Sequence, residues 1–268
     1  MQKITENVYV ENGFRGCNTS FVVTGDGIVV IDTPMVPAEA KKWRDEIAKF
    51  GPVRYVINSE PHSDHVSGNN YFGGLVVGHE GTRAAILHAS VDELKNGLKM
   101  MAPDSLPLEA GFQFRASDIT FSQRMTLYLG KHTFQLIHLP GHSPYQTAIY
   151  VPEERVVFTS DNVTQGMPFF HQAIPYEWLE SLKKYQQLDV DKVVPGHGGV
   201  CDKSFLFEMS RIVQDWIDAV KEAIAAGMSQ EEAQEKVLLP KRYPDMARDQ
   251  RMQGLKKMNV GRLYQVLK

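Results

Sequence analysis

The hexapeptide Glu60-Pro61-His62-Ser63-Asp64-His65 carries four side chains that can bind a metal ion. It follows a short apolar run that is typical of a buried strand. Side chains two positions apart point the same way on an extended backbone, so Glu60 and His62 can converge on one ion while Asp64 and His65 turn toward another. Imidazole and carboxylate groups are common ligands of zinc, iron and manganese. Taken alone, the hexapeptide is equally compatible with a polar turn.

Three more side chains of the metal-binding type are predicted in tight turns directly after strands. They are His142 in Pro140-Gly141-His142-Ser143, Asp161 in Thr159-Ser160-Asp161, and His197 in Pro195-Gly196-His197-Gly198. A glycine before each histidine lets the backbone turn sharply and brings the imidazole to a shared centre. Each could be an ordinary turn residue, but four such sites in this order indicate one metal centre.

The rest of the chain alternates between strand and helix patterns. A helix from 37 is stopped by Gly51, one helical stretch spans 81–101, and 102–117 has no periodicity and is a candidate loop or lid. Closely spaced runs over 119–159 predict mostly antiparallel strands, and an apolar stripe from Phe205 to Ile224 predicts a long helix. Strand pairs and helices interleave twice, which favours one domain of either two packed sheets or one sheet flanked by helices.

Composition narrows the class of protein. The chain has 268 residues, 43% hydrophobic and 23% charged, with a net charge of −3. No Lys/Arg run is longer than a pair, so we expect neither a nucleic-acid nor a membrane-surface partner. No apolar run approaches the roughly 18 residues that cross a bilayer, and no export signal is recognised, so a cytoplasmic location with Cys17 and Cys201 as free thiols is expected.

These motifs together resemble the metallo-β-lactamase-fold hydrolase superfamily. The family order is a strand-end Asp, an H-x-H-x-D-H loop, a G-H, a lone Asp and a final G-H, matched here by Asp32, residues 60–65, His142, Asp161 and His197. The resemblance implies a four-layer αββα sandwich with the metal centre along one edge of the two sheets. It implies a single domain over 1–268, with a core of about 1–202 and a C-terminal helical extension of about 203–268.

The resemblance also implies a dinuclear site for two divalent ions, Zn, Mn or Fe. Its first ion would be held by Glu60, His62 and His142, its second by Asp64, His65 and His197, with Asp161 bridging the two. Asp32 and His138 are expected to orient these ligands from behind without touching metal.

Glu60 departs from the family pattern, since most members have histidine at this position. With two ions at +4 and three carboxylates, the centre keeps a formal +1, whereas histidine at position 60 would leave +2. A less positive centre is a weaker Lewis acid, and more oxygen ligands favour harder ions such as Mn²⁺ or Fe²⁺. The alternative is that Glu60 swings away and one metal position is weak or empty.

The implied reaction is hydrolysis by a hydroxide bound between two metals, with Asp64 as the proton acceptor. Aromatic loops around the site favour a small, partly apolar substrate with an amide, ester, lactone or β-lactam bond. The expected substrate-contacting residues are Asn18, Tyr145, Phe169, Phe170 and His171, together with the loops 14–18, 33–36 and 102–117.

Two other functions remain open. One is an iron-dependent oxidoreductase of the same fold, diiron or similar to sulfur dioxygenases. Flavodiiron proteins place their glutamate where this chain has His62, and they carry a flavodoxin domain that this chain lacks. The other is a metal-binding sensor without turnover. The substrate, the native metal and the oligomeric state, including a homo-oligomer, are not determined by the sequence.

Overall fold

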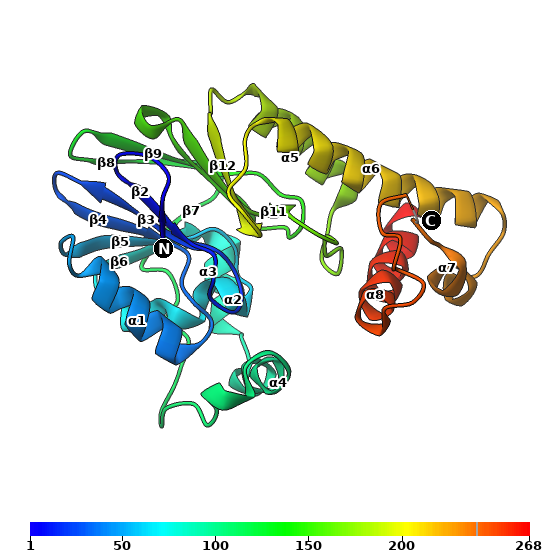
Figure 1. Cartoon of the computed structure of the whole chain (residues 1–268), viewed down its shortest axis with the longest axis horizontal. Coiled ribbons are helices and arrows are strands. Elements are labelled where there is room, and N and C mark those ends of the chain that lie inside the picture. The colour runs from blue at the N-terminus through cyan, green and yellow to red at the C-terminus, as the bar shows by residue number, and fades with distance from the viewer. Residues whose placement is uncertain (240) are drawn as a thin grey trace.

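Two β-sheets pack face to face in the computed structural model, which describes residues 1–239 and 241–268 (Figure 1). The first sheet has seven strands in chain order, and the second has five in the order β12-β11-β10-β9-β8. The strands of the first sheet are β1 (Gln2–Lys3), β2 (Val8–Glu11), β3 (Thr19–Thr24), β4 (Gly27–Ile31), β5 (Val53–Asn58), β6 (Leu75–His79) and β7 (Ile119–Phe121). Those of the second are β8 (Arg124–Leu129), β9 (His132–His138), β10 (Thr147–Val151), β11 (Val156–Thr164) and β12 (Lys192–His197).

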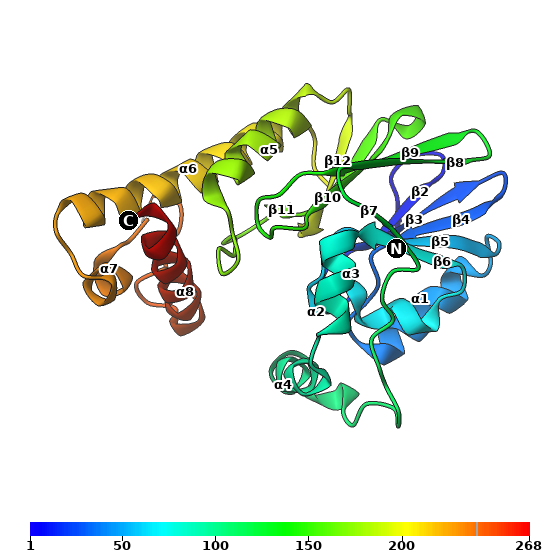
Figure 2. The ribbon, with the colours of Figure 1, turned by 180° about the vertical axis from the view of Figure 1, so that it is seen from behind.

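Helices cover the outer face of each sheet, as both views show (Figures 1 and 2). The first sheet is flanked by α1 (Pro37–Ile47), α2 (Ser63–Val66) and α3 (Glu80–Leu87), and α4 (Val91–Met101) lies farther from the strands, where it packs on Met35 and Val36. The second is flanked by α5 (Pro175–Gln187) and the long α6 (Ser204–Ala225), which leads to α7 (Gln230–Lys236) and α8 (Gln250–Leu267). Short 3-10 turns lie at Ser67–Tyr71, Pro103–Ser105 and Pro152–Glu154.

The alternation of side chains along β4 explains the layering. Ile28 and Val30 pack against α1 with Trp43, whereas Val29 and Ile31 point into the layer between the sheets. Successive side chains of a strand face opposite sides, so a strand that is apolar at every position is covered on both faces. The αββα sandwich is therefore confirmed.

Parallel pairing brings the candidate ligands to one edge. Strands β4, β5 and β6 run parallel, as do β11 and β12. The carboxyl ends of parallel strands lie at the same edge of a sheet. Asp32 directly follows β4, the 60–65 segment follows β5, and His197 ends β12, so residues far apart in sequence meet at the same edge.

Two local predictions are wrong. The helical stretch predicted over 81–101 is two helices, because Ser90 caps α4 by accepting a hydrogen bond from the Glu93 amide. Asp161 lies within β11 and not in a turn after it. Strand β11 continues irregularly, with register shifts around Ser160, whose φ of 49° is left-handed. Such a bulge re-aims the neighbouring side chain, here Asp161.

Strands β8, β9, β10 and β11 pair antiparallel in succession, as the close spacing predicted, whereas β7 joins the other sheet parallel to β6. Among residues 1–239 and 241–268, no helix has both the length and the apolar character needed to cross a bilayer.

Candidate metal centre

The first group of candidate ligands lies at the ends of β5 and β9. Glu60 Oε2 is 2.5 Å from His62 Nδ1, and His142 Nε2 is 3.3 Å from His62 Nδ1 and 3.7 Å from Glu60 Oε2. One donor atom from each of these three residues lies within 4.8 Å of the others. Glu60 Oε2 and His62 Nδ1 are in direct contact, so these two atoms would have to move apart to hold one ion together with His142.

The second group combines α2 with the end of β12. His197 Nε2 lies 3.3 Å from Asp64 Oδ2, and His65 Nε2 lies 3.8 Å from the same oxygen. His65 is completely buried, whereas the side chains of Asp64 and His197 keep exposed fractions of 22% and 31%. This side of the centre is therefore open to solvent, and His62 of the first group is 19% exposed as well.

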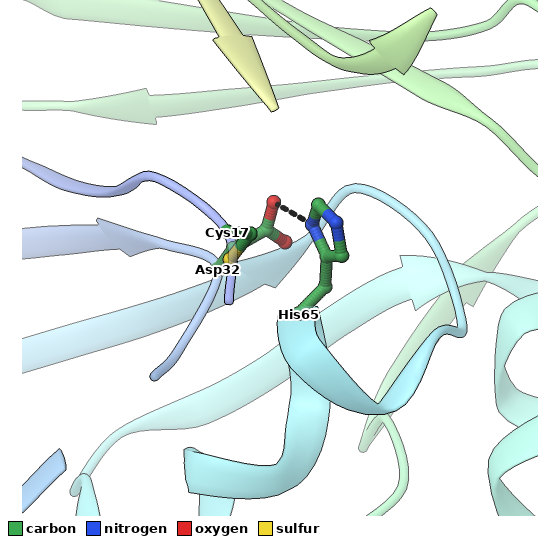
Figure 3. Close-up of side chains that lie close together, drawn as sticks. All are labelled: Cys17, Asp32 and His65. Atoms are coloured by element: carbon green, nitrogen blue, oxygen red, sulfur yellow. Dashed lines mark hydrogen bonds and ion pairs between the residues drawn. The ribbon is translucent and has the colours of Figure 1, made fainter. Parts of the chain in front are cut away.

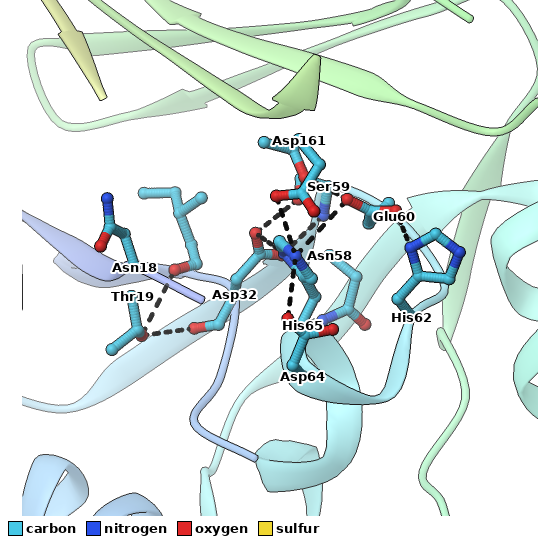
Figure 4. Close-up of polar contacts among 12 residues, drawn as sticks. Asn18, Thr19, Asp32, Asn58, Ser59, Glu60, His62, Asp64, His65 and Asp161 are labelled. Atoms are coloured by element: carbon cyan, nitrogen blue, oxygen red, sulfur yellow. Dashed lines mark hydrogen bonds and ion pairs between the residues drawn. The ribbon is translucent and has the colours of Figure 1, made fainter. Parts of the chain in front are cut away.

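Asp161 lies between the two groups. Its Oδ2 atom is 3.7 Å from His142 Nε2 and 3.3 Å from His197 Nε2. Its Oδ1 atom is 3.4 Å from His65 Nε2, and Figure 4 shows Asp161 above His65. A carboxylate with contacts to both groups has the geometry of a bridging ligand.

Several polar atoms at this centre are buried without a hydrogen-bond partner among the described residues. They include Glu60 Oε2, His65 Nε2 and Asp161 Oδ1. Glu60 Oε2 forms an ion pair with His62 Nδ1 when that ring is protonated. Buried polar groups are normally paired, so imidazole nitrogens and carboxylate oxygens that face one another, with no hydrogen-bond donor or acceptor among the described residues outside the centre, fit metal ions in their chemistry.

Glu60 is held in place by two neutral donors. Gln146 Nε2 donates to Glu60 Oε1 at 2.9 Å, and the Ser160 hydroxyl donates to the same oxygen at 2.8 Å. Both contacts are buried, and Glu60 has no exposed surface. Oε1 is thus fixed by two donors and lies 3.4 Å from His65 Nε2, while Oε2 lies against His62 and His142. Glu60, His65 and Asp161 therefore form a further candidate ligand group. Neither donor was predicted from the sequence. Gln146 and Ser160 lie far from Glu60 along the chain, and no local pattern indicates that they reach it.

Asp32 orients His65 from the opposite side. Asp32 Oδ2 is 2.9 Å from His65 Nδ1, and Oδ1 accepts the Ser59 amide at 2.8 Å. The backbone of Asp32 is left-handed, with a φ of 53°. Because Nδ1–H donates to Asp32, Nε2 is the nitrogen of His65 that would bind a metal ion. This is the position behind the ligands that the sequence predicted for Asp32.

Cys17 completes a small cluster with Asp32 and His65 (Figure 3). The thiol is buried, and burial raises the pKa of Cys17 to about 12, so it stays protonated. Asp32 and His65 already share a hydrogen bond, which leaves no room for an ion between them. We therefore treat this cluster as support for His65 and not as a metal site.

Backbone and amide oxygens orient the other histidines. His142 Nδ1 lies 2.7 Å from the Phe169 carbonyl, and His62 Nε2 lies 3.2 Å from Gln172 Oε1. Each acceptor takes the proton of one ring nitrogen and leaves the other facing the centre. His138 instead donates to the Pro144 carbonyl and stacks on His79, so it supports the turn that carries His142.

Neighbouring charges shift the pKa values of histidines and carboxylates at the centre. Burial opposes charge on His62 and His197, but neighbouring carboxylates outweigh it and raise the pKa of His62 to about 9 and that of His197 to about 11. Burial also opposes charge on Asp161, yet His197 and His65 hold its pKa well below the usual range. Cations are strongly favoured here, so protons and metal ions compete for the same rings.

The two Gly-His motifs are explained by close packing. A Cβ on Gly196 would overlap Asp161 Oδ1, and one on Gly141 would overlap Asn162 Oδ1 and crowd the Trp178 ring. Neither glycine has a positive φ. Glycine stands before these histidines because the backbone lies against neighbouring residues, and not for the sharp turn that the sequence suggested.

The predicted substrate-contacting residues divide into two sets. His171 is exposed, with its ring 5.0 Å from that of His62, and Phe169 is half-buried beside it. Phe170 is completely buried between Trp178 and Trp216, so its ring belongs to the core. The half-buried Tyr145 stacks on His79.

Asn18 also has a role other than the predicted one. Its Nδ2 donates to the carbonyls of Pro195 at 2.9 Å and Gly198 at 2.8 Å, on either side of His197. Its side chain therefore holds the turn that presents His197.

Replacing Asn18 with alanine should weaken binding of one metal ion by about tenfold, because the His197 turn loses both hydrogen bonds. Metal content and chelator competition would measure this effect. Asn12→Ala, on the turn after β2, serves as the control. A raised KM with unchanged metal affinity would instead favour substrate contact by Asn18.

Comparisons with known proteins agree with this arrangement. The family described as the metallo-beta-lactamase superfamily matches residues 12–197. A type 2 metallo-beta-lactamase from Elizabethkingia meningoseptica is 25% identical over 81% of this chain and 85% of its own length. A linear primary-alkylsulfatase from Pseudomonas sp. (strain ATCC 19151) is 24% identical over 80% of this chain and 48% of its own length.

Among solved structures, a stereoselective inverting sec-alkylsulfatase from Pseudomonas sp. superposes with a TM-score of 0.75 at 15% identity, over 98% of this chain and 49% of that protein. The chain thus spans about half the length of both alkylsulfatases. At this identity the superposition shows a shared fold.

Proposed function

Because the chain belongs to the metallo-beta-lactamase superfamily of metallo-hydrolases, we propose that it hydrolyses a small, partly apolar substrate at a dinuclear metal centre. The observation that carries the proposal is the pair of three-residue groups with Asp161 between them. In this proposal Glu60, His62 and His142 hold one divalent ion, Asp64, His65 and His197 hold the other, and Asp161 bridges them. Zn, Mn and Fe all accept such ligands.

Bound ions would polarise the substrate oxygen and lower the pKa of water at the centre. The chain's own residues supply the proton transfer. The Asp64 carboxylate is partly exposed at the open side, so one oxygen can accept a proton from the attacking water and return it to the leaving group. The water oxygen bonds to the acyl carbon, and the bond from that carbon to the leaving group breaks. Ser160, Gln146 and Asp32 keep the ligands oriented throughout.

The bond that is cleaved is an amide, ester, lactone or β-lactam bond in this proposal. The test is a panel of chromogenic substrates, namely a cephalosporin, a nitrophenyl ester and an aromatic lactone, each assayed with the metal-loaded protein. Turnover of at least one, lost on chelation, would support the proposal. Oxygen uptake without hydrolysis would favour the iron-dependent oxidoreductase, and metal binding without either reaction would favour a sensor.

A sulfate ester is the second candidate. The likeness to a sec-alkylsulfatase extends over nearly the whole chain, including α6 to α8. A centre with a formal +1 charge also attracts an anionic ester. Comparing nitrophenyl sulfate with nitrophenyl acetate on the same preparation separates the two candidates.

His171 and Phe170 are adjacent, but their substitutions should affect different properties, namely the kinetics for His171 and the folding stability for Phe170. His171→Ala should change kcat/KM or substrate preference while metal content and stability stay the same, because the exposed ring faces the centre beside His62. Phe170→Ala should cost about 3–5 kcal/mol of folding free energy, because the ring is fully buried. Steady-state kinetics and urea unfolding of both variants measure this contrast. Unaltered kinetics in His171→Ala on every substrate tested would remove it from the substrate site.

A further inference from the structure

The loop between β11 and α5 connects the C-terminal helix with a candidate metal ligand. Asn259 of α8 accepts the Phe170 amide on Oδ1 at 2.9 Å and donates from Nδ2 to the Pro168 carbonyl at 2.7 Å. Asn259 is only 1% exposed, so water does not substitute for these bonds. We call this pair of hydrogen bonds the Asn259 clamp.

Phe169 is the residue between the two clamped positions. Its carbonyl lies 2.7 Å from His142 Nδ1, and this contact keeps the proton on Nδ1 and leaves Nε2 for the metal. The Phe170 ring, buried against Trp178 and Trp216, fixes the other side of the loop. The Phe169 carbonyl therefore has little freedom to move while the clamp is intact.

We propose that α8 is a positioning element of the metal centre, and that the Asn259 clamp sets the orientation and tautomer of His142 through the Phe169 carbonyl. This inference rests on the proposed ligand role of His142. It assigns the C-terminal helices a function at the site, although α8 supplies none of the candidate ligands.

The clamp differs from the hydrogen bond that Tyr264 makes, whereas Arg262 of α8 also reaches this loop by donating to the Ala173 carbonyl at 3.2 Å. Tyr264 on the same helix donates its hydroxyl to the Met228 carbonyl at 2.7 Å, and this bond does not involve the loop. Tyr264→Phe thus removes one hydrogen bond from α8 and leaves the clamp intact. It is the matched control for a general loosening of the helix.

The test compares Asn259→Ala, Asn259→Asp, Tyr264→Phe and His142→Ala in the full chain. Asn259→Ala should weaken one of two Zn²⁺ sites by about tenfold in chelator competition and leave the other unchanged. Asn259→Asp keeps an acceptor for the Phe170 amide but loses the donor to Pro168, so a smaller loss is expected. In the metal-free protein, the His142 Nδ1–H NMR signal should exchange faster in Asn259→Ala than in the wild type.

Tyr264→Phe should lower Tm. Its Zn²⁺ affinity and the exchange rate of its His142 Nδ1–H signal should match those of the wild type. The inference is overturned if both Asn259 variants bind two Zn²⁺ ions as tightly as wild type while His142→Ala loses one. It is also overturned if Tyr264→Phe weakens Zn²⁺ binding as much as Asn259→Ala. Retention of both ions by His142→Ala would instead contradict the proposed ligand set, and the inference with it.

Discussion

Removing the metal ions with a strong chelator is expected to reduce hydrolysis by at least about 10³-fold, and adding Zn²⁺, Mn²⁺ or Fe²⁺ should restore it. Two serines and a cysteine beside the candidate ligands are not available as nucleophiles. Ser59 and Ser160 donate their hydroxyls to Asp32 and Glu60, and the Cys17 thiol is buried and protonated. Without metal, water would be activated only by general bases such as the carboxylates and imidazoles of the centre, without the Lewis acid that lowers its pKa.

Single substitutions test the two metal sites separately. His142→Ala should remove one ion per chain and His197→Ala the other, because each ring belongs to a different group of ligands. Metal analysis by mass spectrometry after gel filtration measures the stoichiometry. His88→Ala is the matched control, since this exposed histidine lies at the end of α3 and its ring bonds the Ala84 carbonyl of that helix. Full turnover in exhaustively metal-free protein, or two ions retained by both variants, would contradict the metal centre as assigned.

Glu60→Gln is expected to weaken one metal site by about 100-fold or more. The structure makes this substitution informative, because Ser160 and Gln146 both donate to Oε1. A glutamine at position 60 would keep its oxygen toward these donors and turn its NH₂ group toward the centre. That group carries no lone pair for a metal and no negative charge. Isothermal titration of the metal-free protein with Zn²⁺ and Mn²⁺ measures the loss.

Glu60→His should have a different result. It raises the formal charge of the centre from +1 to +2 and restores the commoner family pattern, so the preference should move from Mn²⁺ or Fe²⁺ toward Zn²⁺. A more positive centre lowers the pKa of the attacking water further, so the acid limb of the pH–rate profile should move to lower pH. If the wild type and both variants have the same metal content and the same acid limb in the pH–rate profile, Glu60 does not bind metal.

Much of the centre was predictable from the chain alone, since the residue types and their order already indicate the family. The strand ends that carry Asp32, residues 60–65 and His197 could be placed from apolar runs and turn residues, and the αββα fold followed from the resemblance. Short-range patterns carry this information because a strand and the loop after it are set by neighbouring residues.

Other features required the fold. The predicted turn at Asp161 is an irregular continuation of β11, which depends on pairing with β12 and on a left-handed Ser160. One helical stretch was predicted over 81–101, and the break before α4 is a capping interaction of Ser90 that helical character alone does not reveal.

The sequence by itself determined which side chains are available to bind metal, the sheet ends that carry them, and the family to which the chain belongs. Only the tertiary structure decided which atoms face one another and what holds them. Gln146 lies 86 positions from Glu60, and Asn259 lies 89 positions from Phe170, yet these pairs share buried hydrogen bonds. No local pattern encodes such contacts, because they form only when distant elements pack together and exclude water from the groups between them.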